Sequence, residues 1–471
     1  MSIYIKIFFL AFLFFFLSLI TFFFQRMPNK RAREEVTKEV PVVPETKEEP
    51  TTLNDEQNSA LNYAIRKKNI FLTGSAGTGK SFLLHYIIKD LRARGKIVVV
   101  TATTGIAAIQ VGGSTLYSAF SVHPTMVKKN EVRDCKRWTT LDVLVIDEIS
   151  MIEPELFVYL DKQAQKSRKN KSPFGGVQLI LVGDFFQLPP VVSDEAMNFV
   201  FQLPLYQRMF DTQNGVSVEL TQVFRQRDKN FVDLLENMRR GKITPSQLRQ
   251  IEKIMKQPPP ELNNGIKYTK LYGRRHDVDR NNQEELYKIH KDNVTFKATC
   301  VFGSNCDKLT ATEKQKIQVQ ILKNMSMTTD LELREGAQVM LTANLDVEAG
   351  LANGSRGYIL SFEDGFPLVQ FQKCKAQIYT HEWIIEPYTG TTVTVCALPL
   401  KLAYALTIHK SQGQSIDLLE IDLSNCWECG QCYTAFSRAT SLETLRVKNF
   451  HPSAIKTHEA VKDFYDNLVL G

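Results

Sequence analysis

Four short and almost wholly apolar runs recur in the first half of the chain, each followed by a loop of small or polar residues. They are Asn69–Leu72, Lys96–Ala102, Leu141–Glu148 and Val177–Val182. Apolar runs of this length are typical of strands buried on both faces of a sheet. The stretches between them carry helical patterns, such as Ser81–Ile88, and Asn54 or Asp55 can cap an earlier helix. This alternation predicts an α/β fold with repeated β–α–β units, a parallel sheet and helices on its faces.

The pattern changes near residue 331. Short alternating segments separated by turns, such as Ala337–Leu341 and Leu368–Phe371, predict a small β-rich, barrel-like module over residues 331–395. The run Pro399–Ile408 is apolar again and predicts a helix that leads into the polar loop Thr407–Gln414.

A glycine-rich turn follows the first predicted strand and opens a helix. Its residues are Gly74, Ser75, Ala76, Gly77, Thr78, Gly79, Lys80 and Ser81. The order strand, G-x-x-x-x-G-K-S, helix is typical of a P-loop, whose backbone N–H groups surround phosphate. We therefore expect this turn to bind ATP, with Lys80 on the β- and γ-phosphates and Ser81 on Mg²⁺.

Further candidates for nucleotide chemistry follow other strands. Asp147 is expected to hold Mg²⁺ through water, and Glu148 to orient or deprotonate the attacking water. Gln187 could sense a γ-phosphate. Arg225 is a candidate for stabilising its charge, although a lone arginine is usually a surface charge. Gln57 could present its amide to adenine, and taken alone a surface glutamine is the commoner outcome.

Three loops combine small residues with hydroxyl groups or cations. Thr103–Ala108 and Gly112–Phe120 suit contacts to a phosphate backbone, and an ordinary βα loop fits each of them equally well. Thr407–Ser415 is dense in hydroxyl groups, amides and cations, so it can hydrogen-bond phosphates on two sides.

Composition adds few restrictions. A chain of 471 residues has room for two to four domains, and a net charge of +7, spread along the chain, permits an anionic partner without arguing for one. Eight cysteines in this length fit a reducing compartment.

Three of the cysteines, Cys426, Cys429 and Cys432, form the motif C-x-x-C-x-x-C. No fourth ligand is evident, so we expect buried thiols near one face of a helix rather than a metal cluster.

The N-terminus differs from the rest. Within residues 1–24, the run Ile7–Phe24 is uncharged and strongly apolar, and basic residues follow it. It fits a membrane anchor with the rest of the chain on the cytoplasmic side. It fits equally a mis-assigned start, with Met27 as the first residue and Asn29–Arg33 as a nuclear-localisation candidate or a solvated tail. Residues 25–50 indicate a flexible charged linker.

As a set, these motifs resemble superfamily 1 helicases. The resemblance is carried by the P-loop, Thr103–Ala108, Asp147, Glu148, Gly183–Pro190, Arg225, Thr407–Gln414 and Arg438. Three stretches are similar more specifically to the petite integration frequency (Pif) helicases, the superfamily 1B relatives of RecD. They are Pro173–Leu179 leading into Gly183–Pro190, Gly350–Gly357 and Leu406–Gln414. The resemblance covers about residues 51–450.

The resemblance implies two RecA-like P-loop domains with an ATP cleft between them. Residues 51–212 would form the first, residues 213–330 and 396–471 the second, and residues 331–395 an SH3-like barrel inserted in the second. It implies Mg²⁺- and ATP-dependent 5′–3′ movement on single-stranded DNA and unwinding of forked DNA, often also of G-quadruplexes or RNA–DNA hybrids. Such an enzyme would serve DNA replication, repair, recombination or telomere maintenance in a nucleus, mitochondrion or viral replication site.

The resemblance also assigns residues. Gln57 would belong to an adenine-sensing motif, and Arg225 and Arg438 would be arginine fingers. Thr104, Ser114 and His409 fall where the family contacts single-stranded DNA. Their loop neighbours complete the expected nucleic-acid set, and Gly413 is expected at the nucleotide; these neighbours are Gly105, Thr115, Thr407 and Lys410.

Other functions stay open from sequence. One is a membrane-anchored translocase that hydrolyses ATP on DNA without separating strands. Another is a non-catalytic DNA-binding protein that keeps the fold, which the intact set of Lys80, Asp147, Glu148 and Arg438 disfavours. An RNA helicase is a third, because backbone contacts alone do not identify the sugar.

Overall fold

The computed structural model describes residues 53–190, 199–210, 214–257, 267–307, 309–325, 327–346, 349–351, 353–371, 374–388 and 391–470. The predictions for residues 1–24 and 25–50 lie outside these ranges. Within the ranges, no helix combines the length and the apolar character that a membrane crossing requires.

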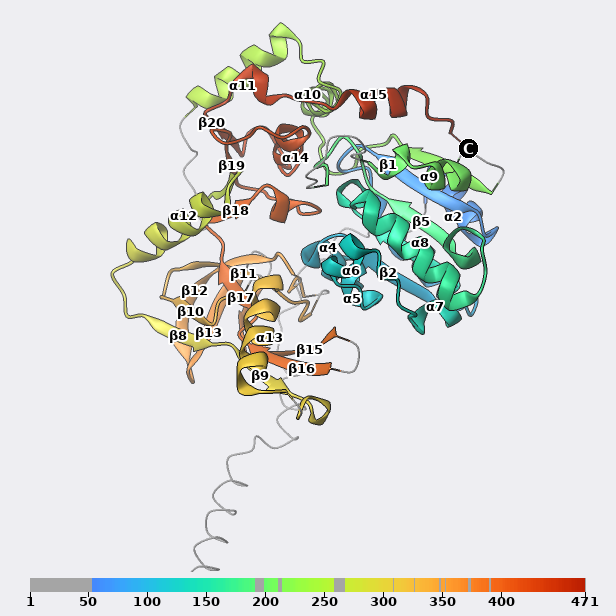
Figure 1. Ribbon diagram of the computed structural model, residues 1–471. Helices are drawn as coiled ribbons and strands as arrows, with labels where there is room; N and C mark the ends of the chain where they lie inside the picture. Colours follow the sequence, from blue (N-terminus) through green and yellow to red (C-terminus); the bar gives the residue numbers. More distant parts are fainter. Residues whose placement is uncertain are drawn as a thin grey trace, which may run out of the picture. The chain divides into compact units, whose positions relative to one another are not determined.

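Six parallel strands form the first sheet, in the order β3-β2-β4-β5-β1-β6. Several of its arrows can be followed in Figure 1. The strands are β1 (Asn69–Gly74), β2 (Val98–Ala102), β3 (Ser114–Thr115), β4 (Val143–Asp147), β5 (Gln178–Val182) and β6 (Gly215–Leu220). The parallel sheet expected from the apolar runs is therefore confirmed.

Helices cover both faces of this sheet. Along β4, Val143 and Val145 pack in one cluster with residues of α2 and α3, whereas Leu144 and Ile146 pack in another with residues of α8. Because side chains alternate along a strand, an uninterrupted apolar run supplies both layers. The helices are α2 (Asp55–Ile65), α3 (Lys80–Ala93), α4 (Gly105–Gln110), α5 (Leu116–Ala119), α6 (Pro124–Lys129), α7 (Arg137–Thr140), α8 (Pro154–Arg168) and α9 (Pro204–Phe210).

The first sheet extends further along the chain than expected. Strand β6 pairs in parallel with β1 over six residue pairs, from Asn69 with Gly215 to Gly74 with Leu220. A first domain ending at residue 212 would leave out this strand. The edge position beside β1 is filled by Gly215–Leu220, which the sequence expectation had assigned to the second domain.

A second parallel sheet has four strands in the order β18-β7-β19-β20. They are β7 (Thr269–Tyr272), β18 (Ala405–Thr407), β19 (Leu419–Asp422) and β20 (Leu445–Lys448). The helices of this half are α10 (Lys229–Arg239), α11 (Pro245–Lys256), α12 (Arg275–Tyr287), α14 (Gln431–Phe436) and α15 (Glu459–Asp466). Two parallel α/β sheets are thus present, as predicted.

The helix predicted over residues 399–408 is wrong. Residues Leu400–Leu402 form β17, and Ala405–Thr407 form β18, which pairs with β7 inside the second sheet. Apolar runs this short do not distinguish a buried strand from a buried helix. Residues Ala405–Thr407 form a strand here because they pair with β7, which lies about 135 residues earlier in the chain.

Residues 331–395, predicted to be β-rich, form antiparallel sheets, and strands outside these residues (β8, β9 and β17) pair with them. A five-stranded sheet has the order β14-β13-β12-β11-β17, a three-stranded sheet β15-β16-β9, and a two-stranded sheet β10-β8. The elements of this region are β8 (Val294–Lys297), β9 (Thr299–Phe302), α13 (Ala311–Asn324), β10 (Asp330–Leu333), β11 (Gln338–Leu341), β12 (Arg356–Glu363), β13 (Phe366–Phe371), β14 (Lys375–Gln377), β15 (His381–Tyr388) and β16 (Thr391–Ala397). Its SH3-like character stays a prediction.

Candidate functional site

The predicted P-loop joins β1 to α3. Gly77 has φ +88°, and a Cβ built on it would lie 2.7 Å from Cβ of Arg225, so glycine is required there. Lys80 folds back over the turn, and its Nζ donates to the carbonyl oxygens of Gly74 and Ser75 at 2.7 and 2.9 Å. Ser81 lies exposed in the first turn of α3. The loop therefore has the backbone path that phosphate binding needs.

The surroundings of Lys80 influence its pKa in opposite directions. Burial lowers the pKa of Lys80 to about 8, and the carboxylates of Asp184, Glu148 and Asp147 act in the opposite direction. A bound phosphate would add negative charge beside the amine and favour its protonated form.

Gln57 is buried rather than exposed. Its Oε1 accepts the backbone N–H of Asn54 and its own N–H donates to Asn54 Oδ1, which closes a capping box on α2. Its Nε2 lies 3.4 Å from a Cβ built on Gly79, and the ring of Phe224 lies 3.6 Å from the same point. Phe224 is 46% exposed. An amide and an open aromatic face thus flank the P-loop, and the sequence had not singled out Phe224.

The two predicted carboxylates lie at the carboxyl end of β4. Asp147 Oδ1 accepts the backbone N–H of Glu148 at 2.9 Å, and Glu148 has φ +52°. Burial and the adjacent charge of Glu148 raise the pKa of Asp147 to about 7. Burial also raises the pKa of Glu148, although the positive charge of Arg438 opposes the shift. Both carboxyl groups are buried beside each other, which disfavours their charged forms. A bound cation would stabilise those charged forms, so the pair suits a cation site.

Glu148 connects loops from both parallel sheets. Gln412, after β18, donates from Nε2 to Glu148 Oε2 at 3.1 Å. Thr103, after β2, donates from Oγ1 to the carbonyl oxygen of Glu148 at 3.1 Å. Glu148, the residue predicted to activate water, is therefore bonded through its carboxylate to the loop after β18 and through its backbone carbonyl to the loop after β2.

The two predicted arginines both donate hydrogen bonds to Ser437. Arg225 Nη1 donates to the carbonyl oxygen of Ser437 at 3.0 Å, and Arg438 Nη2 donates to Ser437 Oγ at 2.8 Å. Burial, then the like charge of Arg438, lowers the pKa of Arg225 to about 9. Burial lowers the pKa of Arg438 as well. Within the described ranges neither guanidinium has a carboxylate within ion-pair distance, so both are short of an anion.

A buried polar network that the sequence did not reveal lies behind the P-loop. Asp184 accepts from Nε and Nη2 of Arg239 at 3.0 Å each, and from the hydroxyl groups of Tyr433 and Tyr465 at 3.2 and 3.4 Å. The Tyr465 hydroxyl also lies 2.6 Å from Thr73 Oγ1 on β1. The network thus joins α10, α14 and α15 to the strand that carries the P-loop. Its only sequence signal was Asp184, within Gly183–Pro190.

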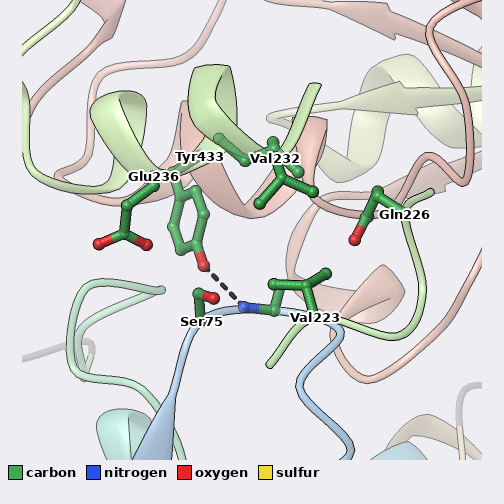
Figure 2. Close-up of a pocket in the computed structure, with 8 residues that line it drawn as sticks. Ser75, Val223, Gln226, Val232, Glu236 and Tyr433 are labelled. Carbon is green, nitrogen blue, oxygen red and sulfur yellow. Dashed lines mark hydrogen bonds between the residues drawn. The ribbon is translucent and has the colours of Figure 1, made fainter. Parts of the chain in front are cut away.

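Tyr433 reaches the P-loop itself. Its hydroxyl accepts the backbone N–H of Ala76 at 2.9 Å, the contact drawn as a dashed line in Figure 2. Burial raises the pKa of Tyr433 well above its usual value, so the hydroxyl keeps its proton and can donate to Asp184. A small pocket beside this contact is lined by Ser75, Ala76, Val223, Gln226, Val232, Leu235, Glu236 and Tyr433.

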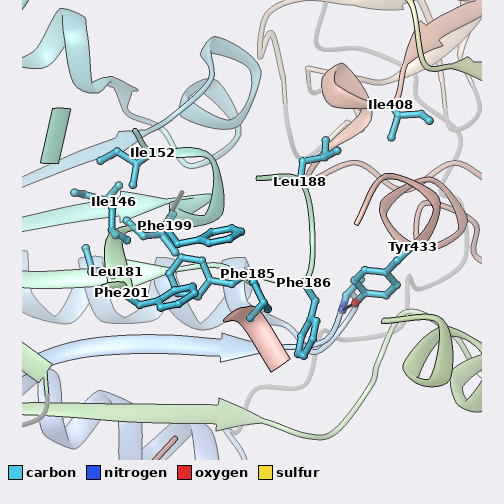
Figure 3. Close-up of a cluster of buried hydrophobic side chains, with 14 of the residues drawn as sticks. Ile146, Ile152, Leu181, Phe185, Phe186, Leu188, Phe199, Phe201, Ile408 and Tyr433 are labelled. Atoms are coloured by element: carbon cyan, nitrogen blue, oxygen red, sulfur yellow. Dashed lines mark hydrogen bonds between the residues drawn. The ribbon is translucent and has the colours of Figure 1, made fainter. Parts of the chain in front are cut away.

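An apolar cluster surrounds the predicted Gln187. Figure 3 shows Phe185, Phe186 and Leu188, from the loop after β5, with Ile408 and Tyr433 from the second half. Gln187 is 5% exposed, and its Oε1 has no hydrogen-bond partner among the described residues. The same is true of Oε1 in Gln226 and Gln412. Buried acceptors of this kind are usually satisfied by water or a ligand.

The predicted nucleic-acid residues of the first sheet come together. Thr101 and Ala102 of β2 pair with Ser114 and Thr115 of β3, so the loops after the two strands share one sheet edge. Thr104 Oγ1 accepts the N–H of Ala107, and Thr115 Oγ1 accepts the N–H of Ser118. Gly105 is exposed at the start of α4. These hydroxyls cap short helices.

The predicted residues of the second sheet lie after β18. Thr407 Oγ1 accepts the N–H of Lys410, and His409 Nε2 lies 3.3 Å from Glu428 Oε2. Lys410 is half-buried and Gly413 exposed. No contact between Gly413 and the P-loop is found among the described residues. The nucleotide role of Gly413 therefore stays a prediction.

The C-x-x-C-x-x-C run is not on one helix. Only Cys432 belongs to α14, and Cys426 and Cys429 lie in the preceding turn, because Gly430 with φ +72° starts the helix late. All three thiols are free. Among the described residues, no group of histidine, cysteine and acidic side chains is placed so that it could hold a metal ion.

Comparison with known proteins gives consistent matches. A family model described as PIF1-like helicase matches residues 52–249, and a model of the DNA helicase Pif1 2B domain matches residues 316–362. The chain is 37% identical over 430 residues to the ATP-dependent DNA helicase PIF1 of Xenopus laevis, covering 88% of this chain and 64% of that protein. It is 32% identical over 510 residues to the ATP-dependent DNA helicase RRM3 of Saccharomyces cerevisiae, covering 89% and 68%.

Solved structures agree. The crystal structure of Pif1 helicase from Candida albicans is similar with a TM-score of 0.76 and 34% identity, covering 89% of this chain and 100% of that one. Pif1 helicase from Bacteroides in complex with ADP-AlF3 and single-stranded DNA is similar with a TM-score of 0.63 and 28% identity, covering 88% and 96%. The expected pair of RecA-like domains is thereby confirmed as the fold of the two parallel sheets.

Proposed function

Because this chain belongs to the family of PIF1-like helicases, we propose that it is an ATP-driven helicase that moves 5′ to 3′ on single-stranded DNA and unwinds duplexes. The chain spans 64% of the length of the Xenopus relative, so the activity is argued from its own residues. The observation that carries the proposal is Glu148, whose hydrogen bonds to Gln412 and Thr103 link the candidate hydrolytic centre to loops after β18 and β2.

The residues fit ATP and Mg²⁺. ATP supplies the phosphoryl group that is transferred to water, and Mg²⁺ neutralises charge on the phosphates. The glycine path of residues 74–79 and the buried amine of Lys80 would hold the phosphates, while Ser81 and Asp147 would hold the metal. Buried arginines without carboxylate partners are what a polyanion site would show, and the unpartnered amide oxygens would accept hydrogen bonds from water beside it.

Adenine would lie against Gln57 and Phe224. The Gln57 amide and the exposed Phe224 ring both stand beside Gly79. An amide can donate and accept at an adenine edge, and an aromatic ring can stack on its face.

Hydrolysis would use side chains already in place. Glu148 takes a proton from the attacking water, and its raised pKa brings the carboxyl closer to the range in which a general base is effective. Gln187 would orient the same water or sense the γ-phosphate. Arg225 and Arg438 would balance negative charge as it develops, the role of arginine fingers.

Coupling to DNA would pass through Glu148. Arg438 also donates to the carbonyl oxygens of Ser411 and Gln414, at 3.4 and 3.5 Å, within the loop that carries Thr407, His409 and Lys410. A change at the nucleotide would therefore move a loop that grips the backbone. Thr104, Gly105, Ser114 and Thr115 would grip it from the first domain.

We propose revised domain limits from the pairing of strands. The first RecA-like domain would run from about residue 51 through β6, and the second would be built on β7, β18, β19 and β20. The insertion would begin at β8 and end with β17. Its SH3-like barrel form belongs to this proposal.

The proposal is tested by ATP hydrolysis of the full chain with and without single-stranded DNA, and by unwinding of forks that carry a 5′ or a 3′ tail. We expect strong stimulation by DNA, unwinding from the 5′ tail, and loss of hydrolysis in Glu148→Gln and Lys80→Ala. Hydrolysis that ignores DNA would contradict the helicase. Stimulation without strand separation would favour a translocase, and stimulation by RNA alone would favour an RNA helicase.

Finer substrates and location follow from the same proposal. G-quadruplexes and RNA–DNA hybrids are compared with forked DNA in the unwinding assay, and the enzyme is placed in a DNA-containing compartment. Roles in DNA replication, repair or recombination rest on the family.

Membrane association through residues 7–24 is tested by vesicle flotation of the full chain against a chain that starts at Met27.

A further inference from the structure

Three cationic side chains gather where the five-stranded sheet of the insertion meets the loop after β18. Lys401 on β17 is paired with Met340 on β11, and Met340 is paired with Arg356 on β12. Directly opposed residues of neighbouring strands project from the same face of a sheet. Lys401 and Arg356 therefore flank Met340 on one face of the strands β11, β12 and β17, which are neighbours in Figure 1.

That face is turned toward the second RecA-like domain. Met340 is 1% exposed and packs in the same apolar cluster as Ala403, Leu406 and Ile408. Arg356 Nη2 donates to Gln414 Oε1 at 3.2 Å, so the loop after β18 lies against the row of cations. Lys410 in this loop is near enough that its charge, after burial, contributes to lowering the pKa of Lys401.

The cations have too little negative charge around them. Within the described ranges no carboxylate lies within ion-pair distance of Arg356, Lys401 or Lys410, and Arg356 Nε has no hydrogen-bond partner. Asp417 and Asp279 act on Arg356 and Lys410 only from longer range. Cations brought together away from water repel one another and lose solvation, so a structure that keeps them without acids is suited to an incoming anion.

We propose that Arg356, Lys401 and Lys410 form a site for one backbone phosphate of a nucleic-acid strand, held jointly by the β-rich insertion and the second RecA-like domain. The inference deepens the proposed function and rests on it. Lysine and arginine are the side chains that bind phosphate in proteins, arginine through its planar fork and lysine as a point charge.

The position of the site favours a polymer over a free ion. Lys410 lies in the loop that begins with Thr407 at the carboxyl end of β18, beside the other residues expected on the strand. Contacts to phosphate position a strand and carry no sequence information. The site would therefore hold any sequence equally and would add one phosphate to the contact length.

The test measures binding of a fluorescein-labelled oligo(dT) to the full chain by anisotropy over a series of NaCl concentrations. Each phosphate neutralised on a single strand contributes about 0.7 to the slope of log K against log salt concentration. We expect the double variant Lys401→Gln/Arg356→Gln to lower the magnitude of this slope by about 0.7, and each single variant to lower it by less, because the three cations share one phosphate. Lys375→Gln is the matched control, because it removes one lysine from exposed β14 of the same sheet.

The outcomes separate this inference from the proposed function. If wild-type protein does not bind oligo(dT), the helicase proposal fails. If wild-type protein binds with a salt slope that Lys401→Gln and Arg356→Gln leave unchanged, or that Lys375→Gln lowers equally, only the phosphate site is overturned. If inorganic phosphate raises the Tm of wild-type protein but not of Lys401→Gln while the DNA slope stays unchanged, the site takes free phosphate and the backbone assignment is wrong. Equal slope changes with oligo(dT) and a mixed-sequence strand support the site.

Discussion

Two kinds of buried arginine lie close together in this protein. Arg239 is held by Asp184 through both oxygens and by Glu236 at 3.1 Å. Burial opposes its charge, yet Asp184 holds the pKa of Arg239 well above its usual value. Among the described residues, Arg225 and Arg438 donate hydrogen bonds only to carbonyl and hydroxyl oxygens, and burial lowers the pKa of both.

The difference separates structural charge from charge that awaits a ligand. Arg239 is neutralised inside the fold and lies 4.6 Å from the ring centre of Phe186, so it joins α10 to the first domain. In the part of the chain that the structure describes, Arg225 and Arg438 have no carboxylate within ion-pair distance, and Glu148 acts on them only from longer range. Residues of the first kind should affect stability when they are changed, and residues of the second kind should affect activity.

The largest expected effect concerns Arg438. In Arg438→Ala we expect DNA-stimulated kcat to fall by about 10³-fold or more, the scale on which arginine fingers act. The Tm should fall less than in Arg239→Ala, because no buried carboxylate loses its ion-pair partner, although the Arg438 hydrogen bonds are lost. Steady-state ATP hydrolysis and thermal unfolding of the same preparation measure both quantities. Substantial unfolding with this variant would place Arg438 beside Arg239 and end the distinction.

The next effect concerns Arg239. Removing one partner of a buried ion pair leaves an uncompensated charge and costs about 3–5 kcal/mol of unfolding free energy. We therefore expect Arg239→Ala to lose that stability in urea unfolding. Arg240→Ala is the control, since Arg240 is half-exposed in its pair with Glu236 and should cost no more than about 1 kcal/mol. Equal losses in the two variants would show that Asp184 gives Arg239 no special role.

A smaller effect is expected at Tyr465. Its hydroxyl accepts the N–H of Phe185 and bonds to Thr73, so Tyr465→Phe leaves buried polar groups without a partner. The cost should be about 1–3 kcal/mol. Tyr379→Phe removes a hydroxyl from a residue that is 57% exposed and should change stability little. Denaturant midpoints of the two variants give the comparison.

The smallest effect is one of pH. The pKa of Lys401 is lowered to about 7, so the amine gains charge as the pH falls from 8 to 6. Affinity for single-stranded DNA should then rise as the pH falls from 8 to 6, by at most about tenfold, because Lys401 is one of several cations that contact the strand. The groups near Lys401 are Arg356 and Lys410, with Asp417 near Arg356 and Arg275 and Asp279 near Lys410.

Lys401→Gln supplies the reference for that measurement, because it removes the Lys401 amine and leaves every other titratable group of the protein in place. The difference in slope of log K against pH between wild-type protein and the variant isolates Lys401. A rise with falling pH that is identical in both proteins would exclude Lys401 as its source.

The local parts of the site could be predicted from sequence. The P-loop and the pair Asp147 and Glu148 each depend on one strand and the residues that follow it, and such patterns are short and self-contained. The capping box that orients Gln57 is local as well, with Asn54 and Gln57 three residues apart. Parallel strands were equally visible, since burial on both faces leaves a continuous apolar run.

The remaining parts depend on contacts between distant residues. Arg239 and Tyr433 lie 55 and 249 residues from Asp184, and no periodic pattern marks such a pair. The strand β18 was mistaken for helix because only its pairing with β7 shows what it is. The partner of β6 was missed for the same reason. The sequence did not indicate a role for Lys401, because a single lysine in an apolar run is typical of an exposed position.

The bond between Tyr465 and Thr73 has a consequence for the order in which the protein is made. Thr73 leaves the peptidyl-transferase centre 392 residues before its partner. At about 5–20 residues per second, roughly 20–80 s separate the two. During that interval Asp184 and the strand below the P-loop lack a hydroxyl that they bond in the finished fold. The hydrogen bonds that tie α15 to the strand before the P-loop and to Phe185 therefore form only after α15 has been translated, and a chain released earlier would lack them.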